Sequence, residues 1–358
     1  MALELVPRAQ RSAVFATLSP VIAIGVTLVL TGVLFAFLGT NPIEGLITYF
    51  IAPFQSVFSA QEVFVKASPL IMIGAGLTIC FRSNVWNIGA EGQFIAGAIA
   101  GGGMALALYN VPGVWVLPLC LMAGLVGGGL WAAIPAVLKT RFRTNEILTS
   151  LMLVYIAGLL LDYLVRGPWR SPEGFNFPES RLFHSDATMP LLMSGGRLHV
   201  GILLAIAIAV TLWVVMAKSL KGYSFRVIGE APRAGIFSGF SPPKTVATVL
   251  ILSGALAGLA GAIEVTGPIG QLLPTVSPGY GFTAIIVAFL ARLNPLGVIL
   301  AGVLLSTTYI GGETAQIRLG VPTDITQVIQ GLLLVCLLAC DTLVNYRIRW
   351  TSAERQAA

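Results

Sequence analysis

The sequence predicts an all-α polytopic membrane protein with about ten transmembrane helices, and its composition is the first reason. Hydrophobic residue types make up 56% of the 358 residues and charged types only 10%, whereas soluble domains usually carry about 25% charged residues. Mean hydropathy is +0.89. The 40 glycines and 20 prolines follow no collagen-like period and form no polar low-complexity tract, which excludes fibrous and disordered proteins.

Long runs without charged side chains are the second reason, because a transmembrane helix needs about 20 mostly apolar residues. The run from Gly92 to Leu138 contains 47 residues and can hold two helices. The run from Ser12 to Ile43 is too long for a signal peptide and lacks a clear cleavage site, so we expect it to remain as a membrane anchor. The predicted spans lie near residues 13–38, 64–81, 87–108, 114–138, 146–165, 199–217, 246–265, 280–292, 295–311 and 325–343.

The distribution of positive charge is the third reason. If the N-terminus is cytoplasmic, fifteen of the 21 lysines and arginines fall inside and six fall outside. This is the positive-inside pattern, which an odd number of spans would scramble. The sequence therefore predicts an N-in, C-in topology, and the net charge of +6 indicates membrane orientation and not nucleic-acid binding. The outer cations are Lys66, Arg166, Arg170, Arg181, Arg197 and Arg318.

A weak internal repeat divides the spans into two groups of five. Ser68-Pro69 opens a span that ends at Arg82, and Ser277-Pro278 opens a span that ends at Arg292; an Asn and a Gly follow each. Such short patterns also recur by chance. We expect the chain to be a single transmembrane domain, 1–358. If the repeat is real, this domain has a first repeat at about 64–165 and a second at about 246–343 around a central pathway.

Polar residues at the entrances of two spans are the candidates for lining a pathway. Glu91 is the only carboxylate between Glu62 and Glu146, and it stands at the membrane end of an apolar helix. Polar breaks in spanning helices often line pathways. Helix capping is the compatible alternative, and it fully explains Thr144-Asn145-Glu146. The candidate pathway residues are Asn87, Glu91, Gln93, Asn145 and Glu146.

The inner loop 218–244 carries the strongest functional signal. It has 27 residues and five cations, and it places Ile236, Phe237 and Phe240 on a short helical face between glycines. An exposed apolar face indicates a partner, here a cytoplasmic subunit. The alternative is an amphipathic helix lying on anionic lipid.

A helix of small residues follows this loop, from Ser253 to Gly261. Gly254 and Gly258 are four residues apart, which predicts a close helix–helix contact. We expect Glu264, at the outer end of this helix, to lie at the membrane interface.

No energy-converting or catalytic motif accompanies these spans. The best candidate for a phosphate-binding loop, Gly239 to Thr245, has proline where the second glycine is required. The two histidines, His184 and His199, belong to no cluster of metal-ligating residues, and the four cysteines have no metal-ligand spacing. We therefore expect no enzymatic activity, no bound cofactor and no metal; energy must come from a partner or an ion gradient.

Three separated motifs resemble the permease subunits of ABC importers in the ribose/branched-chain amino acid family, within its nucleoside and simple-sugar branch. They are Asn87-Ile88-Gly89-Ala90-Glu91-Gly92-Gln93, Thr144-Asn145-Glu146, and the Gly229–Gly239 loop running into Ser253–Ala262. The similarity extends from about Pro69 to Asp341. The first motif is most similar to nucleoside-type members, and the Gly-Ile-Asp-Leu-Ser stretch of ribose permeases is absent.

The resemblance implies a multi-pass importer of the bacterial inner membrane. Its partners would be a second permease subunit, a cytoplasmic ATPase with two nucleotide-binding domains that uses ATP and Mg, and an extracytoplasmic binding lipoprotein. The Pro-rich outer loop 167–198 suits docking of that lipoprotein. Few charges lie in the spans, so we expect a small neutral polar solute, a nucleoside or else ribose or another simple sugar. An ion-coupled carrier without an ATPase, with Glu91 as its titratable group, is the alternative of a different class.

The resemblance also assigns the ATPase-contact role in the inner loop to Glu230, Ala231 and Gly235. Pro232 departs from the commoner family pattern and limits a helix to starting at or after it. The full candidate coupling set is Gly229, Glu230, Ala231, Arg233, Gly235, Ile236, Phe237 and Gly239.

Overall fold

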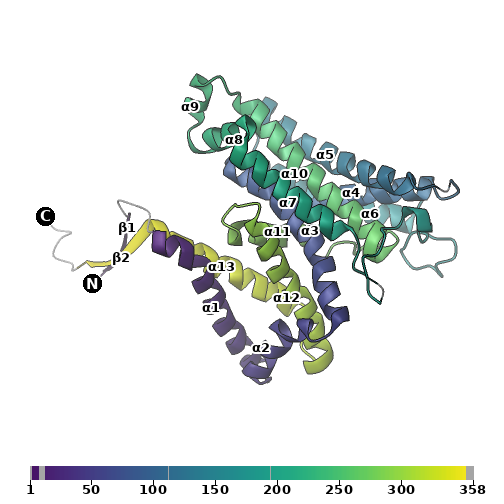
Figure 1. The fold of residues 1–358 in the computed structure, drawn as a ribbon, viewed down its shortest axis with the longest axis horizontal. Helices are drawn as coiled ribbons and strands as arrows, with labels where there is room; N and C mark the ends of the chain where they lie inside the picture. The colour runs from purple at the N-terminus through teal and green to yellow at the C-terminus, as the bar shows by residue number, and fades with distance from the viewer. Residues whose placement is uncertain (1, 8–12, 112, 194, 352–358) are drawn as a thin grey trace. The chain divides into compact units, whose positions relative to one another are not determined.

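The computed structural model describes residues 2–7, 13–111, 113–193 and 195–351 (Figure 1). It divides the chain into two compact units, one formed by Met1–Gln55 with Thr308–Ala358 and the other by Ser56–Thr307. Arg8, Arg11 and Arg355, which the charge count placed inside, lie outside the described residues.

The first unit pairs the two ends of the chain. Its elements are β1 (Ala2–Pro7), α1 (Ala13–Phe37), α2 (Pro42–Phe50), η1 (Ala52–Phe54), the end of α12 (Gly297–Leu319), α13 (Ile325–Asn345) and β2 (Tyr346–Thr351). Helices α1 and α13 pack together, and Phe35 meets Tyr49 edge-to-face with ring centroids 6.1 Å apart. Strands β1 and β2 are antiparallel, with Ala2 opposite Thr351. These two short strands are the exception to the all-α prediction. Tyr346–Thr351 alternates apolar and polar residues with the period of a strand, whereas Ala2–Pro7 has Glu4 as its one polar residue.

The second unit contains most of the predicted spans. Its elements are α3 (Val57–Arg82), α4 (Ala90–Ala107), α5 (Val116–Phe142), α6 (Glu146–Arg166), η2 (Ser185–Ala187), α7 (Gly201–Lys218), α8 (Leu220–Glu230), α9 (Pro232–Phe237), α10 (Pro242–Glu264), η3 (Val265–Ile269), α11 (Tyr280–Leu290) and the start of α12. Figure 1 shows α8 and α9 at one end of this bundle and the loop after α6 at the other. Helix α3 is buried along most of its length.

Glycines set the close packing of α4, α5 and α10. A Cβ on Gly97 of α4 would overlap the backbone of Gly258 in α10. A Cβ on Gly258 would overlap the carbonyl oxygen of Gly124 in α5, and one on Gly128 would overlap that of Gly254. The close contact predicted from the small residues of α10 is therefore confirmed, and it involves two partner helices.

Each of the ten predicted spans coincides with one helix, but seven helices among the described residues are long and apolar enough to cross a membrane. Helix α11 has only 11 residues, because Ser277-Pro278-Gly279 precedes it and Gly279 has φ 97°. The other two predicted spans outside the seven are α4 and α13, and the apolar part of α13, Ile325–Cys340, is shorter than a usual span. Both the seven apolar spans and the ten matching helices fit a polytopic membrane protein. The number of ten transmembrane helices and the membrane topology stay predictions.

Candidate functional site

The inner loop 218–244 forms two short helices, α8 and α9, that fold into a hairpin. The Ser219 hydroxyl oxygen accepts a hydrogen bond from the Gly222 amide at 3.1 Å and so caps α8. Helix α9 begins at Pro232, as the sequence predicts. Proline has no amide hydrogen, and amides in the first helical turn have no acceptor within the helix, so proline fits this position.

Two glycines of the candidate coupling set fix this hairpin on the bundle. A Cβ on Gly229 would overlap the carbonyl oxygen of Arg82 and lie 2.9 Å from Cα of Ser83, at the end of α3. A Cβ on Gly235 would lie 2.5 Å from Cδ1 of Ile228, a buried residue of α8. Helix α8 therefore rests directly on α3, and α9 rests on α8.

The outward face of α9 is apolar. Phe237 is 94% exposed and Ile236 is 58% exposed. Glu230, Ala231, Arg233 and Gly239 are also exposed. Phe240, predicted to share the helical face, instead lies beyond the end of α9, half-buried, with its ring 6.1 Å from that of Tyr223. The predicted partner-binding face thus consists of Ile236 and Phe237.

Two of the candidate pathway residues form a closed hydrogen-bonded network with Ser253 of α10. The Asn87 amide nitrogen donates to Oε1 of Gln93 at 2.8 Å and to the Ser253 hydroxyl at 3.1 Å. The Gln93 amide nitrogen donates back to Oδ1 of Asn87 at 3.0 Å. All three side chains are buried, so the network fixes the start of α4 against α10.

Glu91 caps a helix other than its own. Its Oε2 accepts a hydrogen bond from the backbone amide of Gly281 at 2.6 Å, at the start of α11. A Cβ on Gly281 would overlap the Glu91 backbone, so the two segments are in direct contact. The carboxylate stands in the first turn of α4 and also interacts with the positive end of the α11 dipole.

Asn145 and Glu146 lie apart from these residues, at the turn between α5 and α6. The Asn145 side chain accepts from the Ile147 amide at 2.9 Å and caps α6. Glu146 forms an ion pair with Lys139 near the end of α5. These contacts support the capping interpretation, and a role of either residue in the pathway stays a prediction.

A cluster of charged side chains around two buried carboxylates, Glu62 and Glu264, escaped the sequence prediction. Glu264, expected at the membrane interface, is only 3% exposed, and the Tyr280 hydroxyl donates to its Oε1 at 3.3 Å. The Lys66 ammonium lies 5.6 Å from the centre of the Tyr280 ring. Glu62, also buried, forms an ion pair with Arg197. The sequence contains one signal for this cluster, the charges of Glu62 and Lys66 at the start of an apolar run. Helix α3 begins before this run, at Val57.

The family described as the permease component of the branched-chain amino acid transport system matches residues 59–338. The chain belongs to this family. The match covers nearly all of α3 and the whole chain from there to the end of α12, including the α8–α9 hairpin and the Asn87 network. The sequence resemblance is therefore confirmed.

Three named relatives in this group are ABC transporter permeases. The glucose ABC transporter permease protein TsgB13 of Haloferax volcanii is 36% identical over 97% of this chain and 93% of its own length. The guanosine ABC transporter permease protein NupP of Bacillus subtilis is 31% identical over 94% and 96%. The nucleoside ABC transporter permease protein NupB of Lactococcus lactis is 27% identical over 87% and 88%.

Proposed function

We propose that this permease forms the pathway of an ABC importer for a small neutral polar solute, with a nucleoside as the leading candidate. The observation that carries the proposal is the exposed Ile236–Phe237 face on a hairpin fixed to α3, in a family of ABC permeases. A partner ATPase bound to this face would supply the energy that the chain's own sequence has no motif to supply.

The relatives support a nucleoside and also a second candidate. Permeases named for guanosine and nucleosides are 31% and 27% identical to this chain. A simple sugar is the alternative, because the relative named for glucose is 36% identical. Both solutes are uncharged and rich in hydroxyl groups, which suits a bundle with few charged side chains in its spans.

The proposed complex contains two permease chains over a cytoplasmic ATPase with two nucleotide-binding domains, and an extracytoplasmic lipoprotein delivers the solute. Two similar chains of Bacillus subtilis, NupP and NupQ, share the guanosine name, which supports a paralogous second permease. The location we propose is the bacterial inner membrane. ATP binding would bring two α8–α9 hairpins together, and because Gly229 rests on α3, that movement would reach the bundle.

Uptake measurements test the solute directly. A strain lacking the gene should lose uptake of labelled guanosine and recover it when the chain is supplied with its partners. Glucose, measured in parallel, decides between the two candidates. Equal uptake of both solutes by the parent and the deletion strain would contradict the proposal.

A further inference from the structure

The loop 167–198, predicted to lie outside, is joined to the connection between α10 and α11 by hydrogen bonds. The Ser180 amide donates to the Leu272 carbonyl at 2.9 Å, and the Leu272 amide donates to the Ser180 hydroxyl oxygen at 2.8 Å. The Phe183 amide donates to the Gly270 carbonyl at 2.8 Å. The two segments therefore form one rigid outer surface in the second unit.

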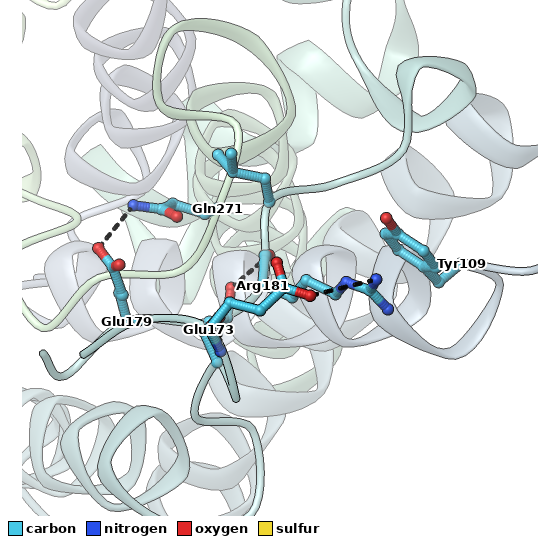
Figure 2. A pocket seen from close by; sticks show the side chains of 9 residues that line it. Tyr109, Glu173, Glu179, Arg181 and Gln271 are labelled. Atoms are coloured by element: carbon cyan, nitrogen blue, oxygen red, sulfur yellow. Dashed lines mark hydrogen bonds and ion pairs between the residues drawn. The ribbon is translucent and has the colours of Figure 1, made fainter. Parts of the chain in front are cut away.

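A pocket of about 360 Å³ opens on this surface (Figure 2). This volume lies within the usual range for small-molecule sites, about 300–1,000 Å³. Its lining comes from both segments and from the turn after α4, and its polar members are Tyr109, Ser171, Glu173, Glu179, Ser180, Arg181 and Gln271.

The polar groups of the pocket are held in place by one another. The Gln271 amide nitrogen donates to Oε2 of Glu179 at 3.2 Å. Figure 2 shows Arg181 between Glu173 and Tyr109: its guanidinium lies 4.0 Å from the centre of the Tyr109 ring and 3.9 Å from a Glu173 oxygen. The Gln271–Glu179 hydrogen bond orders one donor and acceptor pair in advance, which reduces the entropic cost of binding a ligand.

The chemistry of these groups selects a class of ligand. Carboxylate and amide oxygens accept hydrogen bonds from hydroxyl groups, and the guanidinium donates to them. Two carboxylates, Glu173 and Glu179, stand against the one cation Arg181, so the formal charge of the lining is −1. A phosphorylated solute would be repelled, whereas a neutral polyhydroxylated one would find both donors and acceptors.

We propose that this pocket is an outer receiving site for the hydroxyl-bearing solute, a site distinct from the buried Asn87 network. The proposal rests on the proposed function. Gln271 gives the pocket a structural link to the bundle, because its segment continues to Tyr280, the partner of Glu264. Solute held here would contact the connection that leads into α11.

Saturation-transfer NMR on the purified chain in lipid nanodiscs tests this site, with guanosine, glucose and ribose 5-phosphate as probes. We expect transfer to guanosine or glucose and none to the phosphate. Gln271→Ala and Glu179→Gln should each reduce the signal at least about threefold, since each weakens a hydrogen bond to the solute. Asp162→Asn, which changes a carboxylate of α6 outside the pocket, should leave the signal unchanged.

Thermal unfolding of each variant shows whether it is folded, and Glu179→Gln keeps the size of the side chain. No transfer to either neutral solute, equal transfer to the phosphate, or full signal in both folded variants would overturn the receiving site. Uptake by the wild-type transporter separates the two proposals. If uptake occurs while the pocket variants bind normally, only the receiving site fails; if the wild type takes up neither solute, the proposed function fails.

Discussion

His199 lies just before α7, outside the apolar span Gly201–Lys218 that the structure shows, and it is 1% exposed. Its Nδ1 accepts a hydrogen bond from the Gly201 amide at 3.1 Å, so the neutral ring carries its proton on Nε2. Burial lowers the pKa of His199 from its ordinary value of 6.5 to about 4, and the nearby Glu62 carboxylate opposes this change in part. The folded protein therefore holds His199 neutral.

This residue predicts a pH dependence of stability. Because the folded pKa is below the unfolded one, the stability from neutral His199 is complete above pH 6.5 and is lost as the pH falls toward 4. His199→Asn keeps an acceptor for Gly201 but removes the titration. Between neutral pH and pH 5, the free energy of unfolding of the wild type should fall by about 2 kcal/mol, and that of the variant should not show this fall. Thermal unfolding in detergent at both pH values measures the difference, and parallel curves would contradict the prediction.

For single residues, the sequence predicts which polar side chains take part in buried contacts better than it predicts the residues that they contact. Asn87 and Gln93 were chosen together, and the structure joins them through two hydrogen bonds. The contact of Glu91 with Gly281 spans 190 residues, and no local pattern encodes it. The burial of Glu264 was missed for the same reason, because Tyr280, which hydrogen-bonds to it, comes from α11; its place at the membrane interface stays a prediction.

Helices α4 and α11 depend on one another through Glu91. Glu91→Ala leaves the buried Gly281 amide without its acceptor, which costs roughly 1–3 kcal/mol. Glu91→Gln keeps an acceptor oxygen and should cost less. We expect Glu91→Ala to lower the unfolding temperature and solute uptake, and Glu91→Gln to preserve most of both.

The same pair of variants discriminates between mechanisms. In an ion-coupled carrier the titratable Glu91 would be essential, so Glu91→Gln would fold normally but fail to transport. Loss of uptake in a stable Glu91→Gln protein would therefore contradict the structural role and favour the ion-coupled alternative.

Element boundaries were predictable where a single residue determines them. Pro232 places the start of α9, and Gly279 with Pro278 stops α11 from extending toward the outer side. The α8–α9 hairpin was predicted only as one helix, because the contact of Gly235 with Ile228 that folds it requires the three-dimensional arrangement. The terminal strands were missed, since each has only six residues and its partner is at the other end of the chain.

The distribution of positive charge predicts how the whole molecule is oriented in the membrane, with fifteen lysines and arginines inside and six outside. Phe237 of α9 and Phe175 of the outer loop are each 94% exposed, so they provide a matched pair of reporter positions. In cells that express the chain without its partner ATPase, Phe175→Cys should react with a membrane-impermeant maleimide while the cells are intact, and Phe237→Cys only after permeabilisation. The unmodified chain is the control for the native cysteines, of which Cys80, Cys120 and Cys336 are buried and Cys340 is half-buried, so its labelling is subtracted. The opposite labelling pattern would contradict the N-in topology.

The central claim is that the α8–α9 hairpin couples this permease to an ATPase, and solute-stimulated ATP hydrolysis by the assembled complex tests it most directly. Phe237→Ser removes the most exposed side chain of the α9 face, and Tyr163→Ser, an exposed aromatic residue of α6, is the control. We predict that Phe237→Ser lowers stimulated hydrolysis at least about fivefold, as expected when an aromatic anchor is lost from an interface, while the control retains it. Unchanged stimulated hydrolysis after replacement of Glu230, Gly235 and Phe237 would contradict the claim.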